Sequence, residues 1–145
     1  MKKFLHILLA VAVLLVCTSA TLKKDKKSAK ETKVKEAPLV QAEVYGFGFA
    51  ASFTDSVAFY TDIQLLDSAS LVNKSYLNMR YDYSYQLKYY LQDNLQKSDH
   101  VCMIFFNTKL KKLQKEYDKL LSKYRKAGTG LRQIPITDFK FSKPE

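Results

Sequence analysis

Cysteine and histidine are scarce in this chain of 145 residues, which contains two of each. Cys17 and His6 lie in the first twenty residues, which leaves Cys102 and His100 for the rest of the chain. One thiol cannot form an internal disulfide, and two soft ligands do not complete a zinc site. No serine lies in a G-x-S-x-G elbow. The sequence therefore shows no disulfide framework and predicts no metal or cofactor.

Long hydrophobic runs are also lacking. The apolar run from Ile7 to Val16 covers ten residues, whereas a membrane-spanning helix needs roughly 20. Two lysines precede this run, and the small residues Thr18 and Ala20 follow it. This is the pattern of a secretory signal peptide over 1–20, with cleavage after Ala20 and export to the periplasm.

Cys17 offers a second way to complete the export. The run LLVC resembles the lipobox of bacterial lipoproteins, a family in which the cysteine is lipidated and becomes the first residue. In that family the preceding position is normally Gly, Ala or Ser, and here it is Val16. The alternatives are thus a soluble periplasmic protein and a lipoprotein anchored to the membrane through Cys17.

Residues 21–42 have almost no large apolar side chains. They contain seven lysines, three acids and one proline. Such a segment buries too little surface to offset its ordering entropy, so we expect a flexible lysine-rich tether. Removal of 1–20 lowers the net charge from +10 to +8, and half of that charge lies in the tether.

Gly46 and Gly48 raise the question of a nucleotide site, because with Ala51 they have the G-x-G-x-x-A spacing of a dinucleotide fingerprint. That motif requires a strand followed by a helix. Here the glycines alternate with Phe47 and Phe49, and the next polar break leads into a second strand. We therefore predict a strand with one aromatic face and one bare face, against which a helix packs closely or an apolar ligand binds.

Hydrophobic periodicity predicts a single domain over 43–145 with two helices and four strands. The elements are, in order, strand 45–53, strand 57–65, helix 79–97, strand 100–106, the helix that carries Leu110 to Tyr124, and strand 136–141. Asp82 is the expected cap of the first helix and Asn107 or Thr108 that of the second. Strand 100–106 is uniformly apolar, as expected for a central strand covered on both faces.

The predicted fold is of the α+β class. Its order is strand, strand, helix, strand, helix, strand, and the short polar link at 54–56 indicates an antiparallel hairpin. We expect a mostly antiparallel four-stranded sheet with both helices on one face.

Candidate site residues are few. Asp62 lies in the middle of a predicted strand, and His100 is the one histidine outside 1–20, expected to be partly exposed at the strand entrance. These two are the weak catalytic candidates. The aromatic and basic side chains on the rim of helix 79–97 are the binding candidates, namely Arg80, Tyr81, Tyr85, Lys88 and Tyr89.

The block FAASFTDSVAFYTDIQLLDSA, with the lysine-rich helix after VCMIFFN, resembles small exported proteins of unassigned function from Bacteroidales-type bacteria. The resemblance covers most of the domain and implies a cell-envelope location without a known chemistry. The small, basic, exported Skp/OmpH periplasmic chaperones are also similar, but their paired helices are longer than the roughly five turns available here.

These features favour an exported non-enzymatic module that binds a protein or another envelope component. The alternatives are a periplasmic hydrolase acting on an envelope polymer through Asp62 or His100, and an Skp/OmpH-like chaperone. Export argues against a nucleic-acid partner. The lysine-rich tether adds an anionic membrane surface as a second partner.

The tether generates a test. The chain should bind anionic liposomes, because clustered lysines are attracted to acidic lipid headgroups. Co-sedimentation should lose this binding at high salt and after deletion of 21–42. Binding that persists in either condition would contradict electrostatic attachment by this segment.

Overall fold

A computed structural model describes residues 38–145. The predicted signal peptide, Cys17 and most of the predicted tether lie outside these residues. Within 38–145, neither helix has the length and apolar character needed to cross a bilayer. The fold is of the α+β class, and its strand pairings are mostly antiparallel.

The main sheet is built around one strand, β2 (Tyr45–Ala51). Along its whole length β2 pairs with β7 (Val101–Asn107), and on its other side it pairs with β3 (Val57–Thr61) and β4 (Gln64–Leu65). Strand β8 (Gly130–Ile134) lies beyond β3 and runs parallel to it. The sheet therefore has five strands, one more than predicted, because the predicted strand 57–65 is divided into β3 and β4.

A second, smaller sheet has the order β1-β5-β6. It consists of β1 (Leu39–Gln41), β5 (Ser70–Val72) and β6 (Tyr76–Leu77). Strand β1 pairs antiparallel with β5. The prediction that the tether extends to Ala42 is wrong at this end, because β1 belongs to the folded part of the chain.

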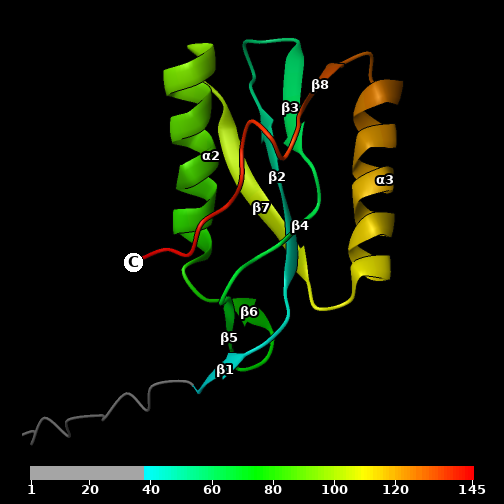
Figure 1. The fold of residues 1–145 in the computed structure, drawn as a ribbon. Coiled ribbons are helices and arrows are strands. Elements are labelled where there is room, and N and C mark those ends of the chain that lie inside the picture. The colour runs from blue at the N-terminus through cyan, green and yellow to red at the C-terminus, as the bar shows by residue number, and fades with distance from the viewer. Residues whose placement is uncertain (1–37) are drawn as a thin grey trace, which may run out of the picture. The chain divides into compact units, whose positions relative to one another are not determined.

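The two helices, α2 (Arg80–Leu95) and α3 (Leu110–Lys126), pack on opposite faces of the main sheet (Figure 1). The prediction of one common face is wrong, and the strand directions give the reason. Strands β3, β7 and β8 all run antiparallel to β2 and are therefore parallel to one another. The chain crosses the sheet from β3 to β7 through α2, and it crosses back from β7 to β8 through α3. Because such crossovers are right-handed, opposite directions of travel place the two helices on opposite faces.

The two faces of β2 differ as the alternation predicts. Phe47 and Phe49 belong to the core under α3, which includes Leu113 and Leu121. Ala50 belongs to the core under α2, where Leu87 and Leu91 are fully buried. A methyl group at Gly48 would lie 2.7 Å from Leu87 Cδ2 and 3.1 Å from Phe141 Cζ. The bare face is therefore covered by the chain's own helix and by its C-terminal residues.

The helix ends differ slightly from prediction. The capping residue of α2 is Met79, in the left-handed conformation at φ 53°, and the predicted cap Asp82 lies in the first turn instead. The capping residue of α3 is Lys109, whose N–H donates to Asn107 Oδ1 at 3.0 Å. Gly128, at φ 78°, follows the end of α3.

The predicted last strand, 136–141, is not a strand. The fourth predicted strand lies earlier, at β8, and the turn at Pro135 accepts N–H bonds from Asp138 and Phe139. Two side-chain amides then bind the backbone that follows. Gln64 donates to Phe139 O and accepts from Phe141 N, both at 3.0 Å. Gln86 makes the same pair of bonds with Ser142, both at 2.9 Å.

Gly48 generates a stability prediction. Gly48→Ala should lower the free energy of unfolding by about 1–2 kcal/mol, because the added methyl group would force the buried Leu87 side chain to shift within the core. Gly130→Ala is the matched control, since a methyl group there meets nothing closer than 3.4 Å. Chemical denaturation measures both, and a Gly48→Ala variant as stable as the control would contradict this packing.

Candidate functional site

Strand β7 lies at the edge of the main sheet. Within 38–145 it pairs with β2 and with no other strand. The prediction of a central strand covered on both faces is therefore wrong. A uniformly apolar run can form a central strand or an edge strand, and the sequence does not distinguish the two. In the structure the side chains of Val101 and Met103 are 54% and 36% exposed.

The backbone of β7 presents alternate residues to the open edge. Ile104 faces Gly48 across the pair, and the Gly48 N–H donates to Thr61 Oγ1 at 2.8 Å, on the side away from β7. Gly48 and Ile104 are therefore a non-hydrogen-bonded pair, one of the alternate pairs of an antiparallel ladder that exchange no backbone hydrogen bonds. The N–H and C=O groups of Ile104 therefore point outward, and by alternation so do those of Cys102 and Phe106.

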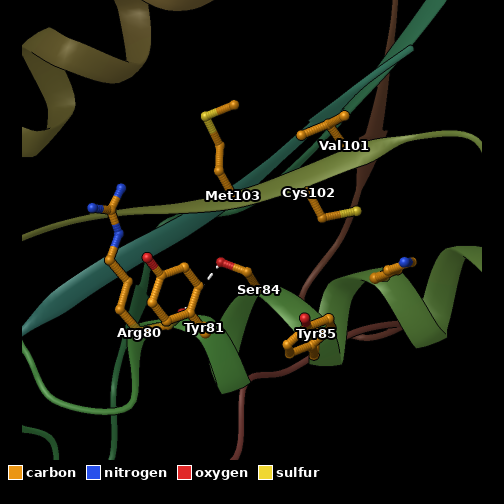
Figure 2. A pocket seen from close by; sticks show the side chains of 8 residues that line it. Arg80, Tyr81, Ser84, Tyr85, Val101, Cys102 and Met103 are labelled. Carbon is orange, nitrogen blue, oxygen red and sulfur yellow. Dashed lines mark hydrogen bonds between the residues drawn. The ribbon is translucent and has the colours of Figure 1, made fainter. Parts of the chain in front are cut away.

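A cleft of 320 Å³ follows this edge on the side of α2. Its lining comes from one stripe of the helix and from the first half of β7, namely Arg80, Tyr81, Ser84, Tyr85, Lys88, Val101, Cys102 and Met103. Figure 2 shows Cys102 pointing toward α2, whereas Val101 and Met103 point away from it. Four of the five binding candidates thus lie together beside the strand edge.

Tyr89, the fifth binding candidate, lies outside this cleft. It lines a smaller depression of 240 Å³ with Tyr85 and the C-terminal residues Pro144 and Glu145. The rings of Tyr85 and Tyr89 stack at 6.2 Å. As the helical spacing predicts, Tyr83 is buried on the opposite side of α2.

Arg80 contacts the open edge directly. Its Nη2 donates to Ile104 O at 3.4 Å, near the limit for a hydrogen bond. Its guanidinium also lies over the Phe106 ring, 5.9 Å from the centroid. This side chain therefore covers one of the outward-facing carbonyl groups of β7.

Cys102 is a protonated thiol at neutral pH. Burial raises its pKa to about 11, and the nearby Lys88 ammonium opposes this shift only in part. Its Sγ donates to His100 O at 3.7 Å. Since the thiolate is the reactive form of cysteine, the cleft contains no activated nucleophile at this position.

A second cleft, of 390 Å³, flanks β7 on the side of α3. It is lined by Phe105, Glu116, Lys119, Leu120 and Lys123. Phe105 and Leu120 both pack against the core under α3. The edge of β7 is thus bordered by a cleft on each face. Sequence reasoning missed the second, because the packing of Phe105 beside α3 arises only in the tertiary structure.

Asp62 has a structural position between β3 and β4, not within a strand. One carboxylate oxygen accepts from Gln133 Nε2 at 2.6 Å, and the other accepts from Ile136 N at 2.8 Å. Asp62 therefore binds the side chain of Gln133 in β8 with one oxygen and the backbone of the turn after β8 with the other. This arrangement gives each carboxylate oxygen a structural partner and does not point to a catalytic role.

His100 is 4% exposed, so the expectation of a partly exposed histidine is wrong. Its Nε2 lies 3.0 Å from Val57 O, and because a carbonyl oxygen only accepts, Nε2 carries the hydrogen. Its Nδ1 is buried without a hydrogen-bond partner among the described residues. The ring packs edge-on against Phe59 at 5.1 Å, so it fills the end of the core.

Asp55, beside His100, connects two loops. Its carboxylate accepts from Lys97 Nζ at 2.6 Å and from Val57 N at 3.0 Å. These bonds join the β2–β3 turn to the segment after α2. Across 38–145, no group of three or more His, Cys, Asp or Glu side chains is arranged to hold a metal ion.

Comparison of the chain with protein-family models, with curated proteins and with solved structures finds no match. The resemblances drawn from the sequence therefore stay predictions. A functional proposal has to be supported by the geometry of the β7 edge and its two clefts.

Asp55 generates a pH prediction. The Lys97 hydrogen bond first, and the Val57 N–H second, hold the pKa of Asp55 below its ordinary value. A lowered pKa adds stability above the ordinary carboxyl range near pH 4, and this stability is lost as the pH falls below it. The free energy of unfolding should therefore decrease as the pH falls below about 4, and it should decrease less steeply in Asp55→Asn. Asp93→Asn, on the exposed face of α2, is the control, and an equal acid slope in both variants would contradict the assignment.

Proposed function

We propose that this protein is an exported, non-enzymatic module of the cell envelope that binds an extended segment of a partner protein along β7. In this mode the segment becomes an additional strand of the main sheet. The open edge of β7, with outward-facing backbone groups at Cys102, Ile104 and Phe106, is the observation that carries the proposal.

Apart from the long contact of Arg80 with Ile104 O, strand β7 lacks the usual protections of an edge against strand pairing. Natural proteins cover or interrupt such edges with charged side chains, prolines, bulges or neighbouring elements. Strand β7 has seven residues without a charge or a proline, and its register with β2 is continuous from Val101 to Asn107. An unbulged apolar edge of this length supports a binding role.

The opposite edge of the sheet is different. Strand β8 has five residues, and two of them, Arg132 and Gln133, are exposed and polar. Gln133 is engaged by Asp62. These features suit an edge exposed to solvent, so the asymmetry between the two edges favours β7 as the binding strand.

The two clefts add recognition to backbone pairing. Side chains of a strand point alternately to its two faces. A segment paired with β7 would place one set of side chains beside α2 and the other beside α3, where the clefts of 320 and 390 Å³ lie. Backbone bonds would supply affinity, and the clefts would select the side chains.

No observation favours the alternatives to the same extent. Asp62 and His100, the hydrolase candidates, are both engaged by backbone groups. An Skp/OmpH-like chaperone needs long helices that pair with each other. Here α2 and α3 have 16 and 17 residues and lie on opposite faces of the sheet.

The test uses a proline at the edge. Cys102→Pro removes an outward-facing N–H, a substitution that edge strands tolerate. Cys102→Val removes the thiol but keeps the N–H. The probes are ten-residue peptides in which valine alternates with glutamine, glutamate or lysine, and binding to the full chain is measured by fluorescence anisotropy.

We expect at least one peptide to bind, and Cys102→Pro to weaken that binding about tenfold or more, since a backbone bond and close approach are both lost. Cys102→Val should bind like the original chain. Peptide binding should also slow amide exchange at Cys102, Ile104 and Phe106. Failure of all three peptides to slow exchange there, or equal binding by the proline and valine variants, would refute strand addition at β7.

A further inference from the structure

We infer that the partner segment alternates acidic and apolar residues, with its acidic side chains beside α2 and its apolar side chains beside α3. This inference rests on the proposed strand addition at β7. It is carried by the different chemistry of the two clefts that border the edge.

The cleft beside α2 is basic, with cations and hydroxyl groups set around a largely apolar lining. Arg80 and Lys88 are its charged residues, and the hydroxyl groups of Tyr81, Ser84 and Tyr85 line it as well. Tyr81 is 80% exposed, so its ring can close over an incoming side chain. Carboxylates are the groups that two cations and several hydroxyl donors bind best.

The spacing of the two cations suits a strand. Lys88 lies eight positions after Arg80 in the helix, a rise of roughly 12 Å. Side chains on one face of a strand recur about every 6.6 Å. Arg80 lies at Ile104 and Phe106, and Lys88 lies close enough to Cys102 to affect its thiol. Acidic residues at alternate positions would therefore meet both cations.

The cleft beside α3 has an apolar floor. Phe105 and Leu120 form it, and the Phe105 ring stacks on the buried Phe47 at 5.0 Å. Lys119 and Lys123 line its rim, where their aliphatic stems can cover an apolar side chain while the ammonium groups stay in water. Valine-like or aromatic side chains fit this cleft.

Arg80 makes the edge selective. A strand that pairs with β7 needs the Ile104 carbonyl, which Arg80 now occupies through a long bond of 3.4 Å. The incoming N–H displaces the guanidinium, which then requires a new partner next to the added strand. A carboxylate at the adjacent position satisfies it, whereas glutamine does so weakly and lysine repels it.

A second copy of this chain fits the edge poorly. Four of the five charged residues in the two clefts are cations, with Glu116 the exception. Pairing of two β7 edges would bring these like charges toward one another. Charge complementarity therefore favours an acidic segment of another protein.

The experiment compares peptides that differ only in charge. Fluorescent ten-residue peptides alternating valine with glutamate, glutamine or lysine are titrated into the full chain at low and high salt. Arg80→Gln tests the selective residue. Arg132→Gln, in β8, is the matched control, because Arg132 lies over the Phe59 ring at the same 5.9 Å, at the opposite edge of the sheet.

At low salt the glutamate peptide should bind about tenfold more tightly than the glutamine peptide, and the lysine peptide should bind least. Arg80→Gln should lower the glutamate preference to about threefold, and Arg132→Gln should leave it unchanged. High salt should reduce the preference in the original chain.

Other outcomes separate this inference from the proposed function. Equal binding of the three peptides, still abolished by Cys102→Pro, would overturn the acidic preference and leave strand addition intact. Absence of binding by all three would overturn both. Concentration-dependent protection of the Cys102, Ile104 and Phe106 amides without any peptide would show that a second copy occupies the edge, and would overturn the choice of an acidic partner.

Discussion

The missing side chain at Gly48 is the constraint on which the rest of the structure depends. Leu87 of α2 and Phe141 of the C-terminal segment both pack into the space that a methyl group would take. Close packing here lets α2 lie against β2, beside the edge of β7. The Gly48 N–H donates to Thr61, so Ile104 across the pair is left to face outward. The missing side chain thereby positions the helix, and the direction of the Gly48 N–H shows which backbone groups of β7 face outward.

Buried polar side chains in the described part of the chain bind the backbone, and His100 Nδ1 is an exception. Gln64 and His100, both nearly inaccessible, bind backbone groups of distant segments, as does Asp62 at the surface. A polar group removed from water needs such a partner, because an unpaired one costs about 1–3 kcal/mol. The groups free to meet a ligand are therefore the exposed cations, hydroxyls and strand edge around β7, which is where a binding role has physical support.

Several elements could be predicted from the sequence because their signal is local. Helix 79–97 is observed as Arg80–Leu95, and its tyrosines divide between core and surface as their spacing predicts. The paired amide bonds of Gln64 and Gln86 could not be predicted, because they join residues 56 to 77 positions apart in the sequence. Residues 136–141 have an alternating pattern but form no ladder, since side chains and a turn at Pro135 satisfy much of their backbone.

The sequence by itself determined the class of the fold, the approximate bounds of both helices and the two unlike faces of β2. These follow from periods of 2.0 and 3.6 residues, which any short window of sequence contains. Only the tertiary structure decided that β7 is an edge strand, that β8 runs parallel to β3 and that the helices lie on opposite faces. Strand order and direction arise from backbone hydrogen bonds between distant segments, and nearly every residue type can make those bonds, so no local pattern records them.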